Sequence, residues 1–147
     1  MILISHRGNL NQPVPSLENN PIYINNAIDL GFDVEVDLWY DSDTLYLGHD
    51  APIYGINYSF LETNKNRLWV HCKNLNALRY LYNSNINYFW HQEDDFTLTS
   101  KGNIWTYPNK NITDKSVVVC KDKNTTIKTA EDHIAYGVCS DYVNLIV

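Results

Sequence analysis

Four groups of residues in this sequence carry side chains that can do chemistry, and each lies in or at the end of an apolar run. Glu35 and Asp37 are two residues apart in the run "FDVEVDLWY". Residues at that spacing point to the same face of a β-strand, so the two carboxylates lie side by side. Neighbouring buried carboxylates repel each other and lose hydration, and a hard divalent cation such as Mg²⁺ or Ca²⁺ offsets both costs. The alternative is a strand end at which both face water.

Histidines and cations lie on other apolar runs. His71 and Lys73 share one face of "VHCKN", His6 and Arg7 end the first run, and His49 ends the third. Two histidines that exchange protons near neutral pH suit general acid–base catalysis, and a neutral imidazole also binds metals. Arginine and lysine suit an anionic phosphoryl group. A lone histidine is more often structural, so this interpretation depends on the convergence of these residues.

Eight short apolar runs are expected to be strands that bring these residues together. They cover 2–8, 32–40, 44–50, 67–74, 86–92, 102–110, 116–122 and 135–143, with helices expected over 20–31, 74–84 and 129–133. Eight strands with helical links predict an α/β fold, a compact (β/α)8 barrel of TIM type, in which the carboxyl ends of the strands share one face. Such barrels usually take about 250 residues, so several outer helices must be shortened or missing. The alternative is an open sheet with fewer strands.

The bulk composition bounds the class of protein. A chain of 147 residues with 44% hydrophobic and 19% charged residues predicts one domain over 1–147. The net charge of -6 argues against a broad nucleic-acid-binding face. The start "MILISHRG" is too short for a signal peptide or a membrane span, so a cytoplasmic location is expected. Cys72, Cys120 and Cys139 are expected to be buried free thiols, because they lack paired spacings.

The motifs "SHRGN", "PSLENN", "DVEVDLW" and "LGHD" resemble the signature of the glycerophosphodiester phosphodiesterase family. This family belongs to the phospholipase-C-like phosphodiesterase superfamily, with the sphingomyelinase D enzymes as relatives. The similarity spans Ile2 to Asp50 and returns in "GVCSDYV", whereas the middle of the chain matches only in strand order. The resemblance implies a (β/α)8 fold, a divalent metal and a small-molecule phosphodiester substrate.

The resemblance also implies a role for each candidate residue. It implies that His6 and His49 are the acid–base pair and that Glu35 and Asp37 are metal ligands. It also implies that Arg7, Lys73 and Glu18 lie at the phosphate. The fourth strand departs from the family pattern, because His71 stands where the family has a third carboxylate. Replacing a carboxylate by an imidazole favours Mn²⁺ or Zn²⁺ relative to Mg²⁺ or Ca²⁺. The short chain implies minimal loops around the substrate.

The sequence therefore predicts a metal-dependent phosphodiesterase that cleaves a glycerophosphodiester-like or sugar-linked phosphodiester. Hydrolysis and transfer to a cyclic phosphate both stay open. Two alternatives are a non-catalytic module that binds phosphate esters in the same pocket and a metal phosphoesterase of the PHP type. Trp90, Trp105 and Tyr107 either stack on substrate or cover strand faces that lack helices. A second copy of the chain, in a homo-oligomer, would provide the same cover.

Overall fold

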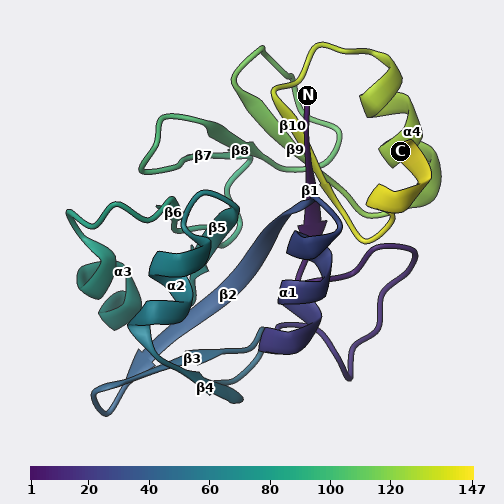
Figure 1. Ribbon diagram of the computed structural model, residues 1–147. Helices are drawn as coiled ribbons and strands as arrows, with labels where there is room; N and C mark the ends of the chain where they lie inside the picture. The colour runs from purple at the N-terminus through teal and green to yellow at the C-terminus, as the bar shows by residue number, and fades with distance from the viewer.

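The structure, a computed structural model that describes residues 1–147, contains one ten-stranded mixed sheet (Figure 1). The strands in chain order are β1 (Ile2–His6), β2 (Asp33–Asp41), β3 (Thr44–Leu47), β4 (Tyr54–Ile56), β5 (Leu68–Cys72), β6 (Tyr88–Phe89), β7 (Phe96–Leu98), β8 (Ile104–Thr106), β9 (Ser116–Cys120) and β10 (Gly137–Ser140). The helices are α1 (Pro21–Asp29), α2 (Tyr58–Asn64), α3 (Leu75–Leu81), α4 (Lys123–Glu131) and the 3-10 turn η1 (Val143–Ile146). None of them is long and apolar enough to cross a membrane.

Parallel pairing joins seven strands in the lateral order β6-β5-β2-β1-β10-β9-β8. The two ends of this series, β6 and β8, share no ladder, so the sheet forms a half-barrel that stays open between them. β3, β4 and β7 are antiparallel additions at β2, β3 and β8. The prediction of a (β/α)8 TIM-type barrel is therefore wrong, and the α/β class describes the fold only loosely.

The main reason for this error is a hairpin. A parallel crossover takes a dozen or more residues, but only Ser42 and Asp43 separate β2 from β3. Both residues have positive φ values, 48° and 59°, as in the two-residue turns that join antiparallel strands. The run at 44–50, expected to be a parallel barrel strand, thus pairs back along β2. The sequence reading also missed α2, β4 and β7, and it started α4 six residues late, at residue 129 instead of 123.

The central strand β2 is covered on both faces. Val34, Val36 and Leu38 are buried in a cluster that also includes side chains of α1 and α3. Strand alternation places Glu35 and Asp37 on the opposite face. In the neighbouring ladders, Glu35 pairs with His6 of β1, and Asp37 pairs with His71 of β5. Sheet register alone therefore gathers four of the predicted site residues.

A second apolar cluster fills the gap between β6 and β8 with side chains. Its buried members are Ile4, Trp69, Phe89, Trp105, Val117 and Cys139. The rings of Phe89 and Trp105 stack with centroids 4.4 Å apart, which links β6 to β8 through side chains where no ladder joins them. Trp105 is therefore a core residue, and all three cysteines are buried free thiols as expected.

Candidate functional site

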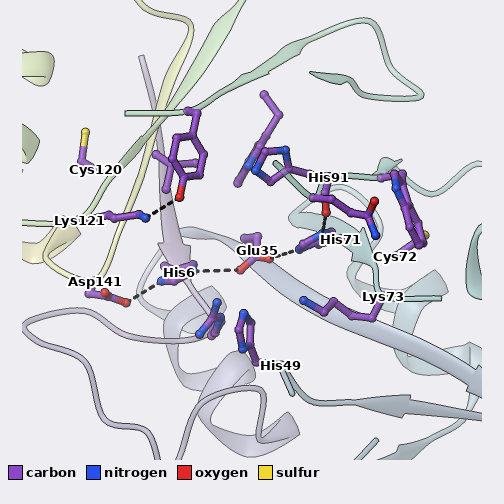
Figure 2. Close-up of a pocket in the computed structure, with 16 residues that line it drawn as sticks. His6, Glu35, His49, His71, Cys72, Lys73, His91, Cys120, Lys121 and Asp141 are labelled. Carbon is purple, nitrogen blue, oxygen red and sulfur yellow. Dashed lines mark hydrogen bonds and ion pairs between the residues drawn. The ribbon is translucent and has the colours of Figure 1, made fainter. Parts of the chain in front are cut away.

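A cavity of about 380 Å³ lies on the face of the sheet that carries Glu35 (Figure 2). Six of the eight residues predicted for the site line it: His6, Arg7, Glu35, His49, His71 and Lys73. The other two, Glu18 and Asp37, lie behind this lining and contact Arg7. The residues that sequence reasoning selected thus converge in space, although the barrel expected to bring them together does not form.

Glu35, Asp37 and His71 form a cluster with the geometry of a cation site. One ligand atom from each lies within 4.8 Å of the other two. The His71 Nδ1 is 3.2 Å from Asp37 Oδ1 and 3.8 Å from Glu35 Oε1. The His71 Nε2 is 2.9 Å from the backbone carbonyl oxygen of His91. Because a carbonyl only accepts, Nε2 carries the proton, and Nδ1 faces the carboxylates, the arrangement common for metal-binding histidines.

The electrostatics of the two carboxylates suit a cation bound between them. Glu35 Oε2 and Asp37 Oδ1 are buried and accept no hydrogen bond of good geometry. Burial and the neighbouring Asp37 raise the pKa of Glu35. Burial also opposes ionisation of Asp37, but His71, Arg7 and Lys73 outweigh it and lower the pKa of Asp37. The set of two carboxylates and one imidazole could therefore hold a divalent cation.

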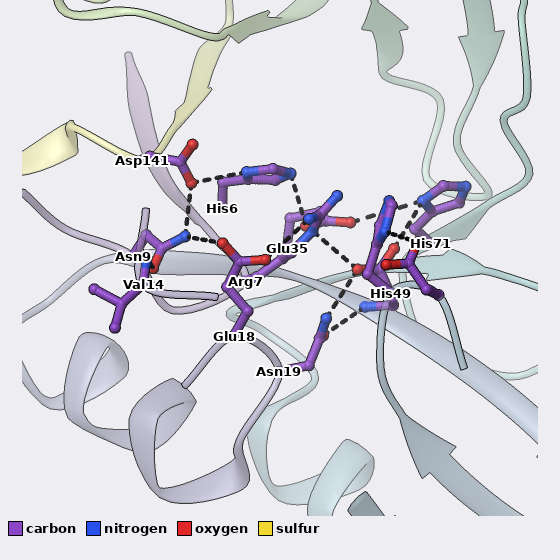
Figure 3. A network of polar contacts seen from close by, with 12 residues as sticks. His6, Arg7, Asn9, Val14, Glu18, Asn19, Glu35, His49, His71 and Asp141 are labelled. Carbon is purple, nitrogen blue, oxygen red and sulfur yellow. Dashed lines mark hydrogen bonds and ion pairs between the residues drawn. The ribbon is translucent and has the colours of Figure 1, made fainter. Parts of the chain in front are cut away.

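Arg7 is fixed in place by a turn and two carboxylates. It has a φ of 56°, an uncommon value for a residue other than glycine. Its Nη1 donates to Glu18 Oε2 at 3.0 Å, and its Nε lies 3.1 Å from Asp37 Oδ2. Glu18, predicted to lie at the phosphate, instead orients Arg7 from behind (Figure 3).

Asn19 holds Asp37, and sequence reasoning did not select it. The Asn19 Nδ2 donates to Asp37 Oδ2, and the backbone N–H of Asp37 donates to Asn19 Oδ1, both at 2.9 Å. Asn19 is fully buried and has a φ of 62°. It stands in "PSLENN", but only the fold shows that its partner lies 18 residues away.

His6 is held by Asp141, which sequence reasoning quoted within "GVCSDYV" without giving it a role. The two side chains are joined by a 2.9 Å contact between His6 Nδ1 and Asp141 Oδ1 (Figure 3). Burial alone would lower the pKa of His6, but Asp141 and Glu35 outweigh it and raise the pKa. Asn9 donates from Nδ2 to Asp141 at 2.7 Å and to Glu18 at 2.9 Å, so it ties the supports of His6 and Arg7 together.

His49 reaches the cavity by a route different from the expected one. It follows β3, which runs back along β2, and the Gly48 N–H donates to the Asp37 carbonyl oxygen at 3.1 Å. The His49 Nδ1 lies 2.7 Å from Asp50 Oδ1. Burial and then the charge of Arg7 lower the pKa of His49, which favours its neutral form. The hairpin, and not the carboxyl end of a parallel strand, therefore places His49 beside the cluster.

The remaining wall of the cavity consists mainly of residues to which no catalytic role was predicted. They are Trp90, His91 and Gln92 after β6, Tyr107 after β8, and Lys121 after β9. For Trp90 and Tyr107 the sequence predicts only stacking on substrate or cover of strand faces. The acidic run Glu93–Asp95, which follows Gln92, does not form a second cluster of metal ligands, and Asp95 pairs with Lys110 at 2.9 Å.

Comparisons of this chain with models of known protein families, with characterised proteins and with solved structures found no match. The motif resemblance over residues 2–50 thus has no support from similarity along the whole chain. The side chains that line the cavity are therefore the basis for its proposed function.

Proposed function

We propose that this protein is a metal-dependent phosphodiesterase that cleaves a glycerophosphodiester-like or sugar-linked phosphodiester by general acid–base catalysis. The observation that carries the proposal is the convergence of His6 and His49 on one cavity with the Glu35–Asp37–His71 cluster. If these groups lay in different parts of the molecule, each could be explained by a structural role alone. Their convergence supports a reaction that moves protons next to a concentrated positive charge.

Arg7 and Lys73 bind the phosphate in this proposal. Both side chains line the cavity and are at most 18% exposed. Their contacts with Asp37, at 3.1 Å and 3.6 Å, hold them in place before substrate arrives. A divalent metal bound by Glu35, Asp37 and His71 would supply further positive charge to stabilise the phosphate oxygens in the transition state.

His6 and His49 transfer the protons. One imidazole accepts a proton from the attacking oxygen, and the other donates a proton to the oxygen of the leaving alcohol. The contact with Asp141 keeps the proton of His6 on Nδ1 and leaves Nε2 for the reaction, on the side where Glu35 lies 3.9 Å away. A water as attacking group gives hydrolysis, whereas a hydroxyl of the substrate next to the phosphate gives a cyclic phosphate.

The other candidate functions receive less support. A PHP-type site would need several metals bound mainly by histidines, but the one candidate cluster contains a single histidine. A non-catalytic module that binds phosphate esters would use the same cavity and differs only in turnover, so the experiment below separates it from an enzyme. A cytoplasmic location, the lack of a nucleic-acid partner and a homo-oligomeric state stay predictions.

The test is release of alcohol from glycerophosphodiesters by the purified protein with Mg²⁺, Ca²⁺, Mn²⁺ or Zn²⁺. We expect His6→Ala and His49→Ala each to lower the rate by about 10²-fold or more, the contribution of one acid–base group. Circular dichroism should show the fold retained in both. The control is His133→Asn, because His133 is exposed and outside the cavity. Two alanine variants as active as the parent would rule the assignment out.

A further inference from the structure

The proposed phosphodiester chemistry uses only part of the cavity. The volume of about 380 Å³ lies within the range of roughly 300–1,000 Å³ that takes whole small molecules. A phosphate between Arg7 and Lys73 fills a small part of this space. The lining of the cavity also includes His91, Tyr107 and Lys121, which we call the distal wall. Figure 2 labels His91 and Lys121 of this wall.

Lys121 is the cation of the distal wall that lacks an acidic partner. Its Nζ donates to the Tyr107 hydroxyl at 2.7 Å and lies 4.6 Å from the centroid of that ring. No carboxylate oxygen lies within 4.0 Å of this Nζ, whereas Arg7 and Lys73 each contact Asp37. The ammonium of Lys121 is thus held at the cavity by a neutral hydroxyl and remains available to an anion.

His91 adds an unpaired polar atom to the same wall. Its side chain is 11% exposed, and its buried Nδ1 has no hydrogen-bond partner. The nearest carboxylate, of Asp94, lies 3.9 Å away. The His91 ring is 5.5 Å from the Tyr107 ring, so the imidazole and the phenol form one continuous surface that leads to Lys121. A ligand group at this wall would meet a cation, a hydroxyl and an imidazole.

We propose that the distal wall is a substrate subsite that binds a second anionic group, a carboxylate or a phosphate, carried by one alcohol of the phosphodiester. The inference rests on the proposed function in assuming that the scissile phosphate lies at Arg7 and Lys73. A quaternary ammonium substituent is disfavoured, because the positive charge of Lys121 repels it. The subsite would therefore select diesters of acidic alcohols.

The test is calorimetric binding of three diesters to the His49→Ala variant, in which slow turnover leaves the ligands intact. The ligands are glycerophosphoglycerol, the same compound with a terminal phosphate, and the diester of glycerol with glycerate. We expect the two ligands with a second anionic group to bind about tenfold tighter than glycerophosphoglycerol, as for one charge-assisted hydrogen bond. Lys121→Met in the same background should abolish this preference, and Lys121→Arg should retain it.

The matched control is Lys115→Met, which removes the same charge at the other end of β9, where Lys115 is exposed. Equal affinity of the His49→Ala variant for all three ligands, or a preference that survives Lys121→Met, would overturn the subsite. A preference lost equally in Lys115→Met would also overturn it, as an effect of overall charge. Turnover of glycerophosphoglycerol by the parent, without any preference for a second anionic group, would support the phosphodiesterase and refute the subsite. A preference that depends on Lys121, without turnover by the parent under any metal, would support the subsite and refute the phosphodiesterase.

Discussion

His6 Nδ1 lies 2.9 Å from Asp141 Oδ1, and the ladder between β1 and β10 brings these two residues together from opposite ends of the chain. The contact fixes the orientation of an imidazole that lines the cavity. Asp141 itself is held by Asn9. We infer that Asp141 is a positioning residue, which holds the His6 imidazole in place at the cavity.

Replacing Asp141 should alter the titration of His6. The hydrogen bond that His6 donates to Asp141 is the largest effect that raises the pKa of His6, so Asp141→Asn should lower that pKa. The rate of diester cleavage should fall by about tenfold or more, because the His6 ring loses the contact that orients it. NMR titration of the histidine ring protons in metal-free protein measures the shift. Asp114→Asn, at an exposed carboxylate, is the control. An unchanged His6 titration would refute the positioning role.

The same ion pair should give stability a pH dependence of defined sign. The pKa of His6 is raised in the folded state, so its contribution is complete below the unfolded value of about 6.5 and is lost at higher pH. The pKa of Asp141 is lowered, since His6 outweighs the effect of burial, so its contribution is present above about pH 3.9 and is lost in acid. Urea unfolding of the parent and Asp141→Asn should differ most near pH 5. A difference that stays constant from pH 2 to 9 would contradict the pairing.

His71 should control which metals the cluster accepts. An imidazole in place of a third carboxylate favours Mn²⁺ and Zn²⁺ relative to Ca²⁺ and Mg²⁺. We therefore expect His71→Glu to shift the ratio of Ca²⁺ to Zn²⁺ affinity by about tenfold or more toward Ca²⁺. Calorimetric titration with each metal, without substrate, measures this ratio, and His133→Asn is again the control. A ratio that is the same in the parent and His71→Glu would show that His71 is not a ligand.

Gly48 should be required for the position of His49. A Cβ at residue 48 would lie 2.0 Å from the Ala51 carbonyl oxygen, so Gly48→Ala must displace the backbone next to His49. We expect a loss of about 1–3 kcal/mol in the free energy of unfolding, together with a lower cleavage rate. Gly55→Ala is the matched control, because its Cβ would meet nothing closer than 3.8 Å. Denaturant unfolding and the cleavage assay measure both effects, and a Gly48→Ala variant equal to Gly55→Ala would contradict this explanation.

The clustering of the site residues could be predicted from the sequence better than the fold could. The spacing of Glu35 and Asp37 already places both carboxylates on one strand face, and the structure brings His71 against them as the matching strand face suggested. The fold prediction failed because short apolar runs do not reveal the direction of a strand. The turn residues Ser42 and Asp43 were the local signal for a hairpin, since a two-residue link cannot make a parallel crossover.

The partners of the site residues could not be predicted from the sequence. Asn19 and Asp141 act on residues 18 and 135 positions away, and nothing in their own neighbourhoods identifies those partners. Lys121 likewise follows an ordinary strand, and it becomes distinctive only because Tyr107 lies beside it. Such contacts depend on strand order, which periodicity alone does not determine.

Phosphorus NMR of a glycerophosphodiester incubated with the protein and a divalent metal tests the central proposal most directly. The proposed function predicts that the diester signal is replaced by that of a phosphate monoester or a cyclic phosphate. It also predicts that a chelator, His6→Ala and His49→Ala each suppress this conversion. A diester signal that persists with every metal, while the ligand still binds, would contradict the phosphodiesterase and favour a non-catalytic binding module.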